Sequence, residues 1–138
     1  GRDVFVRLDV GDEMHASIRE LSEHGISAAA ITSGIGRIRN TVIGYLDADG
    51  VYQKEVLEAP VELLSAQGNL APGSDGASTH IHIVASDDDH TVHGGHLFEA
   101  TVEVTAEMHL RVLGDEDSPF KREATDSEFL QLSFCNLR

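Results

Sequence analysis

Apolar and polar residues alternate through most of this chain, a pattern typical of strands that bury one face. The alternation predicts a first strand over residues 4–9. Asp12 is then a suitable N-cap for the one convincing helix, which is expected to end near His24 with Gly25 as its stop. The apolar positions of this helix recur at spacings of four and three residues and form one stripe of Met14, Ile18 and Leu21.

After the helix the pattern becomes extended, with turn residues between the apolar runs. The expected strands span residues 26–32, 37–46, 51–57, 61–70, 79–86, 97–110 and 129–137. The expected turns and loops lie at residues 33–36, 47–50, 60, 71–76, 87–89 and 94–95. Residues 114–127 are polar and are expected to be irregular.

These elements predict one α+β domain over residues 1–138, with an antiparallel-rich mixed sheet of about seven strands and one main helix that covers part of it. No apolar run approaches the roughly 18 residues of a membrane-spanning helix, and the first ten residues lack a signal peptide's apolar stretch. The single cysteine, Cys135, cannot form an internal disulfide and is interpreted as a small buried apolar residue. A cytoplasmic protein is therefore expected.

The charge balance is strongly acidic. Asp and Glu together number 24 against 10 Lys and Arg, which gives a formal net charge of −14. A protein that binds DNA tightly neutralises phosphates with Lys and Arg, so this charge balance argues against a surface that binds nucleic acid strongly. High solubility is a general reason for such a composition. A more specific interpretation is a halophilic source, because concentrated salt screens the repulsion between like charges.

The most informative residues are three histidines near two adjacent predicted strands. His80 and His82 share one strand face because successive side chains point to opposite faces. His96 follows a tight turn expected at Gly94 and Gly95, so an antiparallel neighbouring strand could bring a third imidazole across to the first two. Three neutral imidazoles suit a divalent transition metal, Zn²⁺ first, with Ni²⁺, Co²⁺ or Cu²⁺ as alternatives, and leave a position for water.

The three histidines also allow alternatives to a metal site, and two neighbouring residues could contribute to one. Strand histidines at this spacing can be hydrogen-bonded without an ion, and the same spacing occurs in cupin-type barrels and carbonic anhydrases. His93 is either a replacement for one of the three ligands or a solvated turn residue. Glu62 lies in a strand beside apolar residues, and a buried carboxylate needs a partner, so it either lines the metal site or anchors a turn.

The remaining candidates are weaker. His90 belongs to an expected exposed acidic turn that lacks the oxygen spacing of a calcium loop. The isolated histidines, for which no ligand role is expected, are His15, His24 and His109. The Ser-Gly-Ile-Gly run at residues 33–36 is only a fragment of a phosphate-binding fingerprint and is interpreted as a turn. The sequence has no G-x-S-x-G nucleophile motif.

The chain contains an ordered set of short motifs: ITSGIG at 31–36, GYLD at 44–47, PVELLS at 60–65, GNL at 68–70, HIHI at 80–83 and GGHL at 94–97. Together these motifs resemble the prokaryotic PPC domain, the plants and prokaryotes conserved domain. The resemblance spans essentially the whole chain, and the order of the motifs makes it specific. It implies an α+β fold, a homotrimer and a metal held by His80, His82 and His96.

The resemblance also bears on function. Plant members carry this domain behind a basic AT-hook that contacts DNA, while the domain itself mediates assembly with partners, and family names carry a candidate DNA-binding label. This chain has no Arg-Gly-Arg-Pro AT-hook and is acidic, so direct DNA binding is not expected. The family supplies no catalytic reaction.

Three classes of function therefore remain. The favoured one is a metal-binding homotrimer that acts mainly through oligomerisation and protein partners, associated with transcription. The second is a metal-dependent enzyme, because three histidines and a water can generate a nucleophile, although no obvious general base lies near the histidines in sequence. The third is direct DNA binding in high salt.

Overall fold

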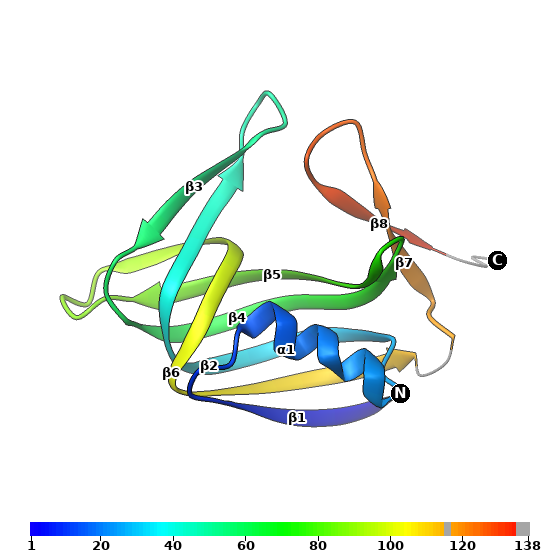
Figure 1. Cartoon of the computed structure of the whole chain (residues 1–138), viewed down its shortest axis with the longest axis horizontal. Helices are drawn as coiled ribbons and strands as arrows, with labels where there is room; N and C mark the ends of the chain where they lie inside the picture. Colours follow the sequence, from blue (N-terminus) through cyan, green and yellow to red (C-terminus); the bar gives the residue numbers. More distant parts are fainter. Residues whose placement is uncertain (115–116, 135–138) are drawn as a thin grey trace.

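The computed structural model describes residues 1–114 and 117–134 of the chain, and strands dominate it (Figure 1). The strands are β1 (Arg2–Asp9), β2 (Ala28–Leu46), β3 (Tyr52–Leu57), β4 (Val61–Gly73), β5 (Gly76–Ser86), β6 (Val92–Gly114), β7 (Phe120–Ala124) and β8 (Leu130–Phe134). The helices are α1 (Met14–Glu20) and the 3-10 helix η1 (Leu21–His24). Every strand pairing within the described ranges is antiparallel, which confirms the predicted antiparallel-rich α+β fold.

Six strands form one sheet in the order β1-β6-β5-β4-β2-β3, and β7 pairs with β8 as a separate hairpin. An additional pairing between β6 and β2 closes β2, β4, β5 and β6 into a ring. The ring can close because β2 and β6 are 19 and 23 residues long, so each pairs with several neighbours along its length. Closure pairs long stretches of β2 and β6 with each other, whereas β1 and β3 each have one partner and remain the edge strands of the sheet.

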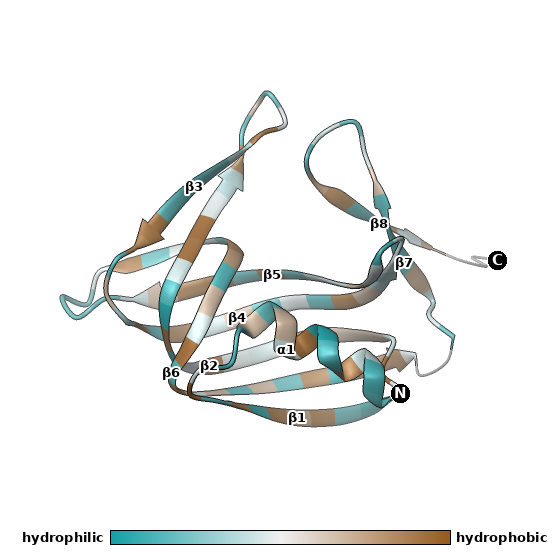
Figure 2. Ribbon diagram, viewed as in Figure 1, coloured by the Kyte–Doolittle hydropathy of each residue, from teal (hydrophilic) through white to brown (hydrophobic). Residues whose placement is uncertain are grey.

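The core lies between the curved sheet and α1, which crosses in front of the sheet in Figure 1. Hydrophobic and hydrophilic residues follow one another along β2 and β6 in Figure 2, as expected for strands with one buried face. The large side chains that are completely buried include Met14, Ile18, Ile38, Leu70, Ile81, Leu97, Met108 and Leu110. The predicted helix stripe is therefore in place, with Leu21 packed at its edge. None of the helices in the described ranges has the length and hydropathy that a membrane crossing requires.

The helix start differs by one residue from the prediction. Glu13, with extended backbone angles, is the N-cap, and its Oε1 accepts a hydrogen bond of 2.8 Å from the Ala16 amide. Asp12 caps the preceding turn instead, because its Oδ2 accepts from the Asp9 amide at 2.8 Å. At the other end Gly25 takes the expected left-handed conformation, with φ of 83°.

Two predicted turns are continuous strand. The chain passes through Ser33–Gly36 as part of β2, and through Gly94 and Gly95 as part of β6. In both places glycine serves close approach of two backbones: a Cβ on Gly36 would lie 2.1 Å from the Thr105 carbonyl oxygen. A Cβ on Gly95 would likewise lie 2.7 Å from the oxygen of Gly44. Register shifts around Gly36 bend β2 without breaking it.

The remaining predictions about connections hold in part. The Asp47–Gly50 turn joins β2 to β3 as predicted, and the turn after Ser86 joins β5 to β6. The predicted loop over 71–76 shrinks to Ser74 and Asp75, because β4 and β5 both continue into it. The region expected to be irregular contains β7, which finds its partner in β8. The predicted last strand is present over Leu130–Phe134. Cys135, which was expected to be buried, lies outside the described residues.

Candidate metal centre

Three histidines come together on the face of β5 and β6 that is turned away from the buried core residues, where these two strands pair. His82 and His96 are direct cross-strand partners, and His80 lies two residues before His82. The ring centroids are 4.9 Å apart for His80 and His82, 5.1 Å for His80 and His96, and 5.4 Å for His82 and His96. One nitrogen from each ring lies within 4.8 Å of the other two.

The nitrogen spacing fits a metal ion. The Nε2 atoms of His80 and His82 are 3.1 Å apart. Two nitrogens bound to one tetrahedral zinc at 2.0–2.1 Å each would lie about 3.3 Å apart. Small side-chain rotations would therefore bring all three rings to ligand distance, and the exposed side of His82 leaves the centre accessible to solvent.

Strand alternation explains why the sequence places these side chains together. Ile81 and Ile83 point into the core and are 0% and 3% exposed, which forces His80 and His82 onto the opposite face of β5. On β6 the buried Leu97 does the same for His96. Burial of the core residues on two paired strands therefore places the three imidazoles together on the opposite face.

Electrostatics keeps two of the imidazoles unprotonated. Burial lowers the pKa of His80 to about 4, with further contributions from the positive charge of Arg122 and from His82. Burial also lowers the pKa of His96 to about 4, together with His80 and His82. At neutral pH both rings are neutral, which is the form that binds a metal ion.

His15 of α1 supports the site from behind. Its Nε2 lies 2.7 Å from the Leu97 carbonyl oxygen and its Nδ1 lies 2.7 Å from the Thr79 hydroxyl. A carbonyl can only accept, so Nε2 carries the hydrogen and Nδ1 accepts from Thr79. Thr79 and Leu97 adjoin His80 and His96, so this buried histidine ties α1 to both strands of the cluster; burial lowers its own pKa.

A hollow of about 160 Å³ lies beside His80 and His96, between the sheet and the β7–β8 hairpin. Tyr52 forms one wall, with its ring 4.7 Å from that of His96. Glu128, from the loop between β7 and β8, also lines the hollow, and its Oε2 accepts a hydrogen bond of 2.7 Å from the Tyr52 amide. Sequence reasoning missed this carboxylate, because 76 residues separate the two partners in the chain.

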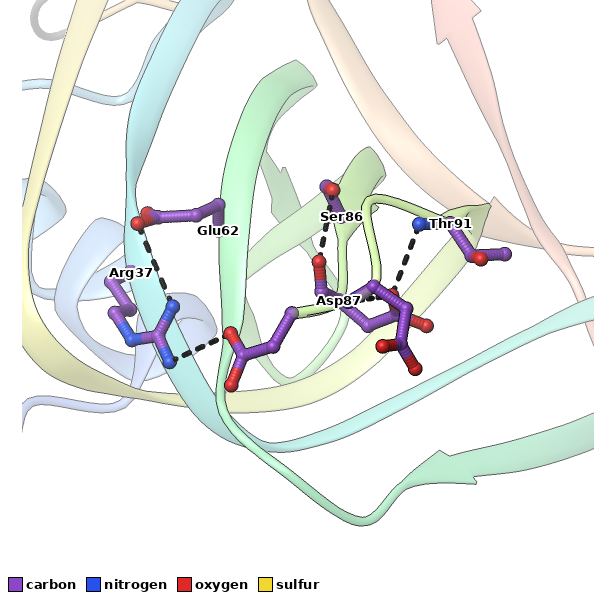
Figure 3. Close-up of polar contacts among 7 residues, drawn as sticks. Arg37, Glu62, Ser86, Asp87 and Thr91 are labelled. Atoms are coloured by element: carbon purple, nitrogen blue, oxygen red, sulfur yellow. Dashed lines mark hydrogen bonds and ion pairs between the residues drawn. The ribbon is translucent and has the colours of Figure 1, made fainter.

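The alternative ligands lie elsewhere. His93 is three residues before His96 and therefore on the other strand face, where its Nε2 lies 2.9 Å from Asp87. Glu62 is exposed and lies 3.5 Å from Arg37, which also reaches Asp88 at 3.4 Å. Figure 3 shows Arg37 and Glu62 beside the turn that begins at Asp87, so Glu62 on β4 is linked to that turn through Arg37 and does not line the histidine cluster.

The other histidines take no part in the cluster. His109 on β6 lies 3.1 Å from Asp3 and also hydrogen-bonds to Thr32. His24 is exposed at the end of η1, and His90 is exposed in the turn between β5 and β6 with φ of 63°. The structure therefore brings together three of the histidines, those at 80, 82 and 96.

The lowered pKa values predict a specific acid sensitivity of the metal-free protein. His80 and His96 have an ordinary pKa of 6.5 when unfolded and about 4 when folded, so the unfolded chain takes up their protons first. Their contribution is fully present above pH 6.5 and is lost as the pH falls toward 4. Thermal denaturation in chelator across this range should show the loss, and a His80→Gln/His96→Gln variant should show a flatter profile. Parallel profiles would contradict this prediction.

Comparison with known proteins places this fold in a family. The family model of the Plants and Prokaryotes Conserved (PCC) domain matches residues 1–114. A PPC protein of Pyrococcus horikoshii is 28% identical, with a TM-score of 0.84 over 99% of this chain and 94% of that one. A metal-containing protein of Archaeoglobus fulgidus is 36% identical, with a TM-score of 0.79 over 100% of this chain and 94% of that one.

A candidate DNA-binding protein of Bacteroides thetaiotaomicron has a TM-score of 0.83 over 97% of this chain and 93% of its own, but its 20% identity supports the fold alone. Among curated proteins, none matches this chain. The family match includes all three clustered histidines and ends before β7. Since it spans most of the sequence and agrees with the fold, the chain belongs to the Plants and Prokaryotes Conserved (PCC) domain family, the PPC domain that its motifs resemble.

Proposed function

We propose that this protein is a metal-binding homotrimer that acts mainly through oligomerisation and partner binding, in a role associated with transcription. The observation that carries the metal part is the cluster of His80, His82 and His96, whose ligand nitrogens lie within 4.8 Å of one another. The 36% identical protein of Archaeoglobus fulgidus, which is described as metal-containing, supports the same interpretation.

Zinc is the proposed ion. Three neutral imidazoles with no carboxylate among them match its preference for nitrogen ligands and leave a fourth position for water or another ligand. Elemental analysis of protein purified without chelator should find close to one metal ion per chain, and reconstitution with zinc should complete the occupancy. Protein that remains metal-free after reconstitution would refute the proposal.

An exposed apolar surface supports self-association. Ile35, Leu64 and Val104 are 56%, 47% and 60% exposed and line a shallow hollow of about 470 Å³ on one side of the sheet. Contiguous apolar surface of this kind commonly marks an interface. The proposed occupant is a second copy of the chain, because the family resemblance implies a trimer and a closed symmetric assembly limits itself.

Duplex DNA is expected to bind weakly or not at all in moderate salt. Besides the net charge of −14, cations with a carboxylate within ion-pair distance include Arg7, Arg37, Arg39, Arg111 and Lys121. Such pairing reduces the positive charge available to phosphates. Fluorescence anisotropy with a short labelled duplex is the measurement. Submicromolar binding that weakens steeply with salt would overturn this expectation.

The hollow beside His80 and His96 favours a second candidate, a metal-dependent enzyme of unassigned reaction. A bound zinc would lower the pKa of a coordinated water, and the Glu128 carboxylate lines the same hollow. Turnover that is abolished both by metal removal and by Glu128→Gln would favour this candidate over the assembly role.

A further inference from the structure

The hollow beside the histidine cluster also contains a buried cation. Arg122 on β7 is only 6% exposed and lines the hollow together with His80 and His96. Its two terminal nitrogens donate to Asn69 and to the Leu130 carbonyl oxygen, while its Nε–H has no acceptor within residues 1–114 and 117–134. All of these partners are neutral. In the same ranges no carboxylate lies within ion-pair distance of the guanidinium.

A buried cation without a counter-ion is costly, because burial removes the water that stabilises its charge. The positive charge of Arg122 also acts on His80: burial is the main reason for the lowered pKa of His80, and repulsion by the Arg122 charge lowers this pKa further. The exposed Glu128 carboxylate lines the same hollow and keeps its negative charge, but it does not lie within ion-pair distance of the guanidinium, and its Oε2 accepts from the Tyr52 amide at 2.7 Å. The hollow is therefore positive on the Arg122 side, and a bound metal would add positive charge on the histidine side.

Other parts of the lining are apolar. Tyr52, Phe129 and Leu130 contribute to it, and Leu130, whose carbonyl oxygen accepts from Arg122, is 47% exposed. The planar guanidinium can form paired hydrogen bonds with a carboxylate or a phosphate. The apolar lining favours an organic carboxylate, because its hydrocarbon part can contact apolar side chains and inorganic phosphate has no such part. A volume of about 160 Å³ admits a molecule of only a few heavy atoms.

We propose that this hollow binds a small organic carboxylate, which places its charged end at Arg122 and its apolar end against Tyr52, Phe129 and Leu130. The inference deepens the proposed metal function, because a metal on the histidines would be the second anchor for the carboxylate. The Arg122 anchor does not need the metal. It comes from β7, beyond the region that the family model matches.

The probe is butyrate, with butyramide as its neutral isostere, titrated into zinc-loaded and metal-free protein and followed by backbone amide NMR of β7 and β8. Zinc-loaded wild type should bind butyrate and not butyramide, and Arg122→Gln should weaken butyrate binding about tenfold or more, as expected for loss of a hydrogen bond to a charged group. Lys121→Gln is the matched control, since it removes the same charge from an exposed neighbour on β7 and should bind as wild type does.

The metal-free arm separates this inference from the metal proposal. Metal-free wild type should bind butyrate more tightly than metal-free Arg122→Gln, and this expectation holds even if zinc proves not to bind at all. If zinc binds, the zinc-loaded wild type should bind butyrate more tightly than the metal-free wild type. Equal affinities of wild type and Arg122→Gln in both arms would overturn the inference, as would equal binding of butyramide. Tighter binding of inorganic phosphate than of butyrate would overturn the assignment to a carboxylate.

Arg122 also holds the β7–β8 hairpin through Asn69 and Leu130, so the substitution could disturb the fold. A measurement on wild type avoids this problem. The Nε–H resonance of Arg122, assigned by its disappearance in Arg122→Lys, should shift when butyrate is added, because a negative charge placed beside the guanidinium changes the environment of this N–H. An unchanged resonance at saturating butyrate would overturn the role of Arg122.

Discussion

Replacing His82 by alanine is expected to abolish stoichiometric zinc binding, with a loss of affinity greater than about 100-fold. Loss of a partner outside the ligand set costs about 10–100-fold, so loss of one of three ligands should cost more. His82 is the ligand to replace because its side chain is exposed and its removal leaves no cavity in the core. Elemental analysis and competition with a chromogenic chelator measure the effect.

The matched control is His93→Ala. His93 lies on β6 close to the cluster in sequence, but its ring lies 2.9 Å from Asp87 on the other strand face. This variant should therefore retain zinc at the wild-type level. Zinc should also raise the melting temperature of wild type and of His93→Ala, since a ligand that binds only the native state stabilises it. Wild-type zinc affinity in His82→Ala would rule out the proposed site.

Val104→Glu is expected to convert the proposed trimer into monomers. Wild type should have a mass three times 14.9 kDa in light scattering, and the variant should have the mass of one chain. Val104 is 60% exposed in the isolated chain and lies on the apolar surface with Ile35 and Leu64. Glutamate there would bury an unpaired carboxylate in each copy of the interface, which is strongly unfavourable.

Salt and a second variant sharpen this test. Each chain carries a formal charge of −14, so the subunits repel one another. The Debye length falls to about 3 Å at 1 M salt, which screens this repulsion, so the proposed trimer should dissociate less in molar salt than in dilute buffer. Val10→Glu is the control, because Val10 is 61% exposed but lies in the turn before α1, outside the apolar hollow. A wild-type monomer at every salt concentration would refute assembly, and a dimer would refute its threefold form. A trimeric Val104→Glu would place the interface elsewhere.

Local periodicity was enough to predict much of the architecture. The helix stripe of Met14 and Ile18, the Asp47–Gly50 turn and the strand character of most segments all depend on neighbours within a few residues. The same alternation predicted that His80 and His82 share a face, because Ile81 and Ile83 need the core. Each of these features repeats at two or at three to four residues, so sequence spacing carries it directly.

Features that depend on distant partners could not be predicted in this way. Gly36 and Gly95 have the local pattern of turn residues, yet each lies in a strand where another backbone approaches too closely for a Cβ. The long strands and their closure into a ring follow from pairing between β2 and β6, which the alternation alone does not specify. The sequence thus predicted most of the strands, but it divided β2 at residues 33–36, began β6 only after Gly95 and did not predict β7.

The surroundings of the histidines were also decided by the tertiary structure. Ring closure and the β7–β8 hairpin bring Tyr52 to Glu128 and Asn69 to Arg122, pairs that lie 76 and 53 residues apart in the chain. The sequence by itself determined which histidines can share a strand face, because strand alternation is a local property of the backbone. The tertiary structure alone decided that a buried cation and a carboxylate line the hollow beside them, since burial and charge proximity exist only after distant segments have packed.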